Sequence, residues 1–208
     1  MLKITSLFTP LVLLILILGP TNRCLGDELG EILKDVAKNA HSGNIPRALR
    51  LLDDATRILG RGYGAKLKEF IPQNLGEDFQ GGKIQELPFF TLQAELRRIY
   101  KHRSTNNKIE LRLVGTTSSA TGHSMACVTH FPAELTQHMG LRKVTIKGRS
   151  ATIGSSAGLE GGKASSGLNL SVCIKNADLS FSVREPFEAE ELITIAGHYD
   201  FEALEKFT

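Results

Sequence analysis

The sequence predicts an α+β protein: a helical hairpin near the N-terminus, followed by an antiparallel β-sheet with helices packed on one face. Three observations support this class. Residues 27–59 carry apolar side chains at helical spacing, and residues 168–184 alternate apolar and polar side chains as strands do. Residues 189–204 return to helical spacing. Antiparallel strands with helices between and after them form such a layered domain.

Residues 1–26 have the composition of a secretory signal peptide. Lys3 provides the basic start, residues 11–18 form an apolar run, and the small residue Gly26 precedes Asp27. The apolar run is shorter than the ~20 residues that a membrane-spanning helix needs, so we expect no retained transmembrane segment. An uncleaved anchor is the alternative. We therefore expect a periplasmic or secreted protein, with envelope association as one possibility.

Beyond the signal peptide, we expect a helical hairpin over residues 27–72, a connector over residues 73–88 and an antiparallel α+β domain over residues 89–208. Residues 1–26 contain two basic residues and no acidic one, so their removal lowers the formal net charge from +3 to +1. A chain so close to neutrality has no compositional basis for binding nucleic acid, and we expect none as a partner.

The helical hairpin rests on two amphipathic segments. Gly43 ends the first, over residues 27–42, and the second runs over residues 46–59. Helices joined by so short a turn lie antiparallel. Three glycines follow, each lowering helix stability by about 1 kcal/mol relative to alanine, so we expect the helix to break there. They are Gly60, Gly62 and Gly64.

The second half begins after a polar, glycine-bearing connector over residues 73–88. Residues 89–101 fit either a helix or a strand by their period. We favour a strand, because it can form a hairpin through residues 104–107 with the alternating residues 109–114. One or two more strands are expected around residues 144–153, and the small residues 154–167 are expected to form a flexible loop.

The central feature of the second half is a β-hairpin over residues 168–185. Folding the chain at Asn176 and Ala177 places all its apolar side chains on one face. The expected cross-strand pairs are Ile174 with Leu179, Val172 with Phe181, and Leu170 with Val183. Residues 189–196 then form an amphipathic helix, and Asp200 caps a last short helical turn.

Several runs carry a family resemblance. The run SGNIPRALRLLDDATRIL, followed by the Ile71-Pro72 step, resembles a GD-x-x-x-A-x-x-x-LD-x-A helix pair, with Asn44 at the position of the Asp. The runs KVTIKGRSATI and EELITIAGHYDFEAL lie on either side of the central hairpin. Together they resemble a group of exported proteobacterial proteins of unknown function, in which such a helix pair precedes an antiparallel sheet domain. The resemblance implies an exported location and this domain order, and no particular chemistry.

One constellation suggests a metal site. Residues 122–131 are expected to be helical, with a second short helix over residues 132–140. His123, Cys127 and His130 would then share one stripe of the first helix, and imidazole with thiolate suits zinc or copper. The flanking apolar residues equally fit a core helix with histidines at its border, and the spacing lacks the paired motifs of established metal sites.

Other motifs do not indicate catalysis. Residues 154–158 match G-x-S-x-G around Ser156, but glycines follow where that motif needs a helix, so we expect neither a triad with Asp178 and His198 nor an enzyme.

Export to an oxidising compartment allows the two mature-chain cysteines to pair, which the sequence leaves open. These are Cys127 and Cys173.

Charged and polar residues gather in three places, each of which fits either an interaction surface or a solvated face. A basic turn contains Arg97, Arg98, Lys101, His102, Arg103 and Lys108. An acidic C-terminal segment contains Glu185, Glu188, Glu190, Glu191, Glu202 and Glu205. The polar face of the central hairpin contains Asn169, Ser171, Ser180 and Ser182.

We therefore expect an exported, soluble accessory or binding protein without catalytic machinery or cofactor, acting on an unknown protein or small-molecule partner. The alternative is a periplasmic protein that binds zinc or copper through His123, Cys127 and His130.

Overall fold

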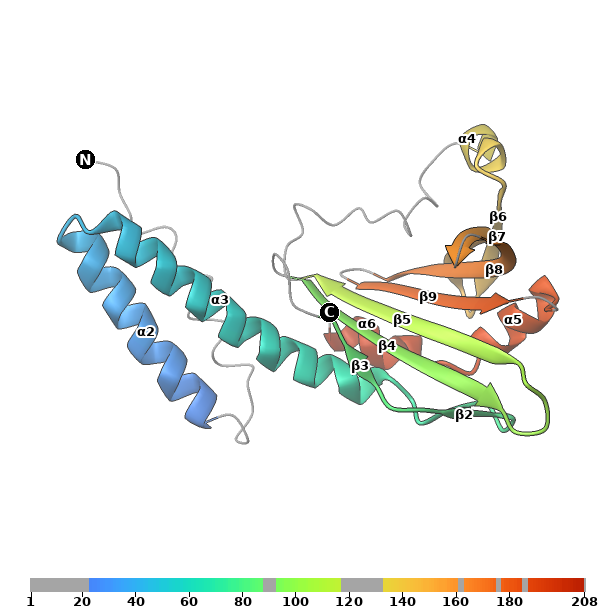
Figure 1. Cartoon of the computed structure of the whole chain (residues 1–208), viewed down its shortest axis with the longest axis horizontal. Coiled ribbons are helices and arrows are strands. Elements are labelled where there is room, and N and C mark those ends of the chain that lie inside the picture. Colours follow the sequence, from blue (N-terminus) through green and yellow to red (C-terminus); the bar gives the residue numbers. More distant parts are fainter. Residues whose placement is uncertain are drawn as a thin grey trace. The chain divides into compact units, whose positions relative to one another are not determined.

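The structure is a computed structural model, in which the described residues are 23–87, 93–116, 133–160, 163–174, 177–184 and 187–207. The chain forms two compact units, Met1–Gly62 and Tyr63–Thr208. A helical pair precedes an antiparallel sheet with further helices, so the predicted α+β class is confirmed (Figure 1).

The first unit is built from helix α2, Arg23–His41, and most of helix α3, Ile45–Leu67. Gly43 connects them with φ of +78°, a left-handed conformation that glycine adopts without strain. The buried residues between the two helices form a small cluster. It contains Leu29, Ala55 and Ile58, with Ile32, Leu33 and Leu59 partly buried around it.

The predicted helix break at three glycines is wrong, because α3 continues through all of them to Leu67. All three glycines lie within the helix and are buried. A Cβ added at Gly64 would lie 3.6 Å from the Cβ of Ala94, an ordinary packing distance. Burial thus offsets the low helix propensity of glycine. The boundary between the two compact units nevertheless falls here, after Gly62.

The second unit contains a nine-stranded sheet in the order β1-β2-β4-β5-β9-β8-β7-β6, with β3 also paired to β4. Every neighbouring pair of strands is antiparallel. The strands are β1 Asn74–Leu75, β2 Phe79–Gly81, β3 Gln85–Glu86, β4 Gln93–His102, β5 Lys108–Thr116, β6 Leu141–Ile146, β7 Arg149–Glu160, β8 Lys163–Ile174 and β9 Ala177–Arg184.

Two segments predicted to lack strands belong to the sheet. The connector over residues 73–88 contains β1, β2 and β3, which pair with each other and with β4. The expected flexible loop over residues 154–167 lies mainly in β7 and β8, which pair from Ala151 with Val172 to Glu160 with Lys163. Backbone hydrogen bonds need no apolar side chains, so small residues can extend a ladder that their composition does not reveal.

The central hairpin exists, but its register differs from the prediction by two residues. Val172 pairs with Leu179, and Cys173 pairs with Asp178. The other apolar pairs are Leu168 with Val183, Leu170 with Phe181, and Ile174 with Ala177. A shift of two residues keeps every side chain on its predicted face, because strand side chains alternate with a period of two. The two-faced hairpin is therefore confirmed, and its pairing is corrected.

The apolar face of the sheet is covered by two helices, α5 Ala189–Ala196 and α6 Phe201–Phe207. Helix α5 packs on β8 and β9, and α6 packs on β8 (Figure 1). Asp200 accepts a hydrogen bond through Oδ1 from the Ala203 amide at 3.1 Å, which confirms its capping role. The fully buried residues of this layer include Leu111, Leu170, Phe181, Leu192, Tyr199, Phe201 and Leu204.

The short helices η3 Lys68–Phe70 and α4 Ala133–His138 complete the described elements. Helix α4 packs against β6 and falls within the helix predicted over residues 132–140. The first predicted helix of that region, over residues 122–131, lies outside the described residues.

An ion pair joins α6 to the sheet. Arg149 on β7 donates to Glu205, with Nε to Oε1 at 2.7 Å and Nη2 to Oε2 at 2.6 Å. The guanidinium carbon of Arg149 also lies 5.3 Å from the centre of the Phe201 ring. The hydrogen bonds from Arg149 hold the pKa of Glu205 below its ordinary value of 4.5.

This ion pair predicts a pH-dependent contribution to stability. A lowered folded-state pKa adds stability above the unfolded value of 4.5, and that stability is lost as the pH falls through the lower folded value. Glu205→Gln is expected to lower the melting temperature at pH 7 by about 2–4 °C, because a partly exposed pair contributes ~1 kcal/mol. The difference from wild type should disappear well below pH 4.5. Equal melting temperatures at pH 7 would contradict the role of the pair.

Candidate functional site

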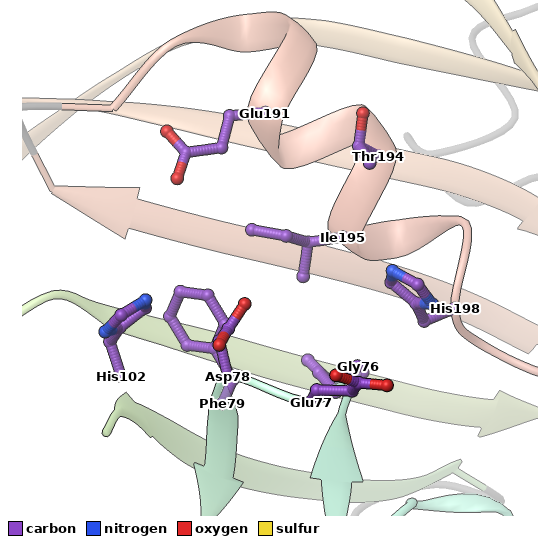
Figure 2. Close-up of a pocket in the computed structure, with 10 residues that line it drawn as sticks. Gly76, Glu77, Asp78, Phe79, His102, Glu191, Thr194, Ile195 and His198 are labelled. Atoms are coloured by element: carbon purple, nitrogen blue, oxygen red, sulfur yellow. The ribbon is translucent and has the colours of Figure 1, made fainter. Parts of the chain in front are cut away.

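A cleft of about 290 Å³ opens between the turn that joins β1 to β2 and helix α5. Figure 2 shows the turn residues on one side of the opening and the α5 residues on the other. The lining residues are Leu75, Gly76, Glu77, Asp78, Phe79, His102, Glu191, Thr194, Ile195 and His198. All of them belong to the second unit.

The turn between β1 and β2 requires glycine at position 76. Gly76 has φ of +63°, and a Cβ at this position would lie 3.2 Å from Cδ2 of His198. Both the backbone conformation and the close approach of the imidazole therefore exclude most side chains. His198 is placed just after α5, where its amide donates to the Ile195 carbonyl at 3.0 Å. The two sides of the cleft meet at this contact between Gly76 and His198 (Figure 2).

Two side chains of β4 hold the segment that carries the turn. Arg98 donates through Nη1 to the Pro72 carbonyl at 2.9 Å and through Nε to the Gly82 carbonyl at 2.8 Å. Tyr100 donates its hydroxyl to the same Pro72 carbonyl at 2.7 Å. Arg98 was grouped with the basic turn by sequence, but its guanidinium bonds to backbone carbonyls. It fixes both ends of the segment that contains β1 and β2.

The aromatic wall of the cleft is formed by His102 and Phe79. Their rings lie edge to face, with centroids 4.9 Å apart. Nδ1 of His102 accepts a hydrogen bond from the Ser104 amide at 3.2 Å, so Nε2 is the ring nitrogen left for a ligand. The Ser104 hydroxyl lies 3.2 Å from the same Nδ1. Hydrogen bonds between a side chain and a residue two positions further along the chain are typical of tight turns.

The Asp, Glu, Lys and Arg side chains that line the cleft are all acidic. Glu77, Asp78 and Glu191 are exposed carboxylates, and none of them forms an ion pair with another residue in the described part of the chain. By contrast, two other acids of the same region are paired: Glu190 with Arg142 at 2.9 Å, and Glu205 with Arg149. The acidic C-terminal segment is thus divided between structural ion pairs and the cleft.

The metal ligands suggested by the sequence, His123, Cys127 and His130, lie outside the described residues, and this site stays a prediction. Cys173 is disulfide-bonded. Within the ranges that the structure describes, no group of three or more His, Cys, Asp or Glu residues could hold a metal ion, and this includes the cleft.

The nucleophile motif does not form the elbow that its chemistry requires. Ser156 lies within β7 and pairs with Gly167 on β8, so the segment continues as a strand. An exposed nucleophilic serine needs a sharp turn from strand to helix. His198 and Asp178, the other members of the rejected triad, belong to the cleft and to β9.

The polar face of the central hairpin is partly satisfied by its own hydrogen bonds. Ser182 donates its hydroxyl to Oδ1 of Asn169 at 2.8 Å, and Asn169 donates through Nδ2 to the Ser171 hydroxyl at 3.1 Å. On the same face, Glu95 accepts from Arg112 through Oε1 at 2.7 Å and through Oε2 at 2.9 Å. Because these polar groups already form hydrogen bonds within the sheet, they have fewer free donors and acceptors for a ligand than the unpaired carboxylates of the cleft have.

A scan against protein-family models finds no match, and searches of the curated proteins and of the solved structures find none either. Among the residues that could be searched, no helix has the length and apolar character needed to cross a membrane.

Proposed function

We propose that this chain is an exported, non-catalytic binding protein whose cleft takes the cationic end of its ligand, an alkylammonium or guanidinium group. One observation carries the proposal: Glu77, Asp78 and Glu191 surround a formed cleft without a cationic partner among the described residues. Carboxylates that share a concave site raise the local concentration of cations and repel anions.

The rest of the cleft suits an organic cation better than a bare ion. Leu75 and Ile195 are buried and offer apolar contact to methylene groups. Phe79 and His102 offer aromatic surface, on which ammonium and guanidinium groups bind favourably. Since the described His and acidic side chains do not converge on a metal position, a larger cation that contacts several walls fits the site.

The proposal of export and of a non-catalytic role has separate support. The disulfide at Cys173 is typical of proteins in oxidising compartments, in agreement with the leader pattern of residues 1–26. Near the cleft, the Ser104 hydroxyl contacts His102 inside one turn, and Ser104 is not among the lining residues. A serine placed there does not face a ligand in the cleft.

Calorimetric titration of the purified chain at low ionic strength tests the proposal. The probes are cadaverine, L-arginine and a lysine tripeptide with blocked ends, with glutarate as the anionic control. We expect the cations to bind and glutarate not to bind. Preference for the tripeptide over cadaverine would identify basic side chains of a peptide as the natural ligand, and the reverse would identify a free amine.

Two variants locate the binding. Glu191→Gln and Asp78→Asn are each expected to weaken cadaverine binding by about 2- to 5-fold, since each removes one exposed charge interaction worth up to ~1 kcal/mol. Glu188→Gln is the matched control, because Glu188 is an exposed carboxylate beside α5 that does not line the cleft. Equal weakening by all three variants, or no heat with any cation at about 10 mM, contradicts the proposal.

A further inference from the structure

The first unit exposes a stripe of large apolar side chains on α3. Ile45, Leu49 and Leu52 have 50%, 60% and 41% of their surface exposed. Their spacing of four and then three residues places them on one face of the helix. Single exposed apolar residues are normal on a protein surface, whereas adjacent ones that form a patch mark a site of interaction.

This unit also has little core of its own. Its described part, residues 23–62, consists of two helices around the small cluster of Leu29, Ala55 and Ile58. Two helices bury only the faces that they turn toward each other. A helical pair with so small a buried cluster gains stability from further apolar contacts, and association with another copy is a common source of them.

The charges on α3 indicate which partner fits the stripe. Arg47 and Arg50 are exposed and form no ion pair with any residue of the described part of the chain. One turn later, Asp53 and Asp54 are paired only along their own helix, with Arg57. The surface of α3 is thus positive at one end of the stripe and negative toward the other.

We propose that α3 docks antiparallel against α3 of a second copy of this chain. With the two-fold axis near Leu51, Leu49 packs against Leu52 of the partner subunit, and Arg50 lies beside Asp53 of the partner subunit. The contact is then self-complementary in shape and in charge, as a two-fold interface requires. A parallel arrangement would place Arg50 against its own copy. Two helical hairpins joined in this way form a four-helix bundle.

The oligomeric state of the purified chain tests the proposal. Light scattering coupled to size exclusion, over about 1 to 100 µM, is expected to show a dimer whose fraction rises with concentration. Leu49→Glu should raise the dissociation constant at least about 100-fold, because it places a charge at the centre of an apolar contact. Leu49→Met, which keeps size and polarity, is the matched control and should dimerise as wild type does.

Exchanging the charges of Arg50 and Asp53 distinguishes a loss of this interface from a loss of folding. Arg50→Asp and Asp53→Arg should each weaken self-association, because each places like charges opposite one another. An equimolar mixture of the two variants should form a heterodimer, since both cross-subunit contacts then join opposite charges. Recovery on mixing is not expected of misfolded proteins.

Three results would overturn the proposal: a monomer throughout the concentration series, a dimer that Leu49→Glu leaves intact, or no recovery in the mixture. If Leu49→Glu lowers the melting temperature of a chain that stays monomeric, the stripe is covered by another part of the same chain. That result would leave the cleft and its ligand unaffected, because none of the cleft residues lies on α3.

Discussion

Replacing Phe181 with alanine lowers the free energy of unfolding by about 3–5 kcal/mol, the largest effect that we expect from a single substitution. Phe181 is fully buried at the middle of β9, and its ring lies 6.2 Å from that of Tyr199. The alanine leaves a cavity in the layer between the sheet and α5, and the surrounding side chains can fill it only in part.

Urea denaturation followed by circular dichroism measures this effect. Ser180→Ala, one residue away and on the opposite face, should change the free energy of unfolding by no more than about 0.5 kcal/mol. Phe181→Leu provides a smaller perturbation if the alanine variant does not fold. Equal small effects at positions 180 and 181 would show that the buried and polar faces of β9 are assigned wrongly.

Gly115→Ala is the second large effect, expected to destabilise the protein by about 1–3 kcal/mol through overpacking. A Cβ at Gly115 would meet Cε1 and the hydroxyl of Tyr63 at 2.7 Å each, and Cδ1 of Leu67 more closely still. Tyr63 also stacks on Phe207, with ring centroids 5.6 Å apart. The alanine therefore has to displace several packed groups where the end of α3 meets β5.

Gly64→Ala is the matched comparison in the same unit. Its Cβ would meet Ala94 at the ordinary distance of 3.6 Å, and alanine is favoured over glycine inside a helix. We expect this substitution to raise stability by about 0.5–1 kcal/mol, opposite in sign to Gly115→Ala. If both variants shift the denaturation midpoint in the same direction, the packing of α3 on β4 and β5 is not as described.

The two-faced sheet could be predicted from sequence because its signal is local. In β8 and β9 nearly every second residue is apolar, and this alternation determines which side chains are buried. It does not determine the register, because Val172 can face either Leu179 or Phe181 with similar apolar contact. The position of the turn decides between them, and the local sequence indicated that position only within a residue or two.

The extent of α3 and of the β7–β8 pair could not be predicted for a different reason. Glycines and other small residues give no clear local signal, because their effect on a helix or strand depends on what packs or pairs with them. Gly64 lies against Ala94 of another element, and Gly158 pairs with Ser165 across the β7–β8 ladder. Packing and ladder pairing outweigh the low propensity of these residues. Composition alone therefore favoured a break and a loop.

The cleft was missed because its two sides are more than 100 residues apart. Residues 75–79 come from the predicted connector, and residues 191–198 from the C-terminal helix. The local signal was the Gly76-Glu77-Asp78 turn, whose two acids are not matched by nearby bases in sequence. Which other acids it would face depends on the contact between Gly76 and His198, which has no local pattern.

The position of the bound cation is measured most directly by following backbone amide resonances of the isotope-labelled chain during titration with cadaverine. Binding in the cleft predicts that the largest shifts occur at Gly76, Asp78, Thr194 and His198. Shifts concentrated on the polar face of the sheet, around Asn169 and Ser182, or spread evenly over all exposed acids, would contradict a cation site between the β1–β2 turn and α5.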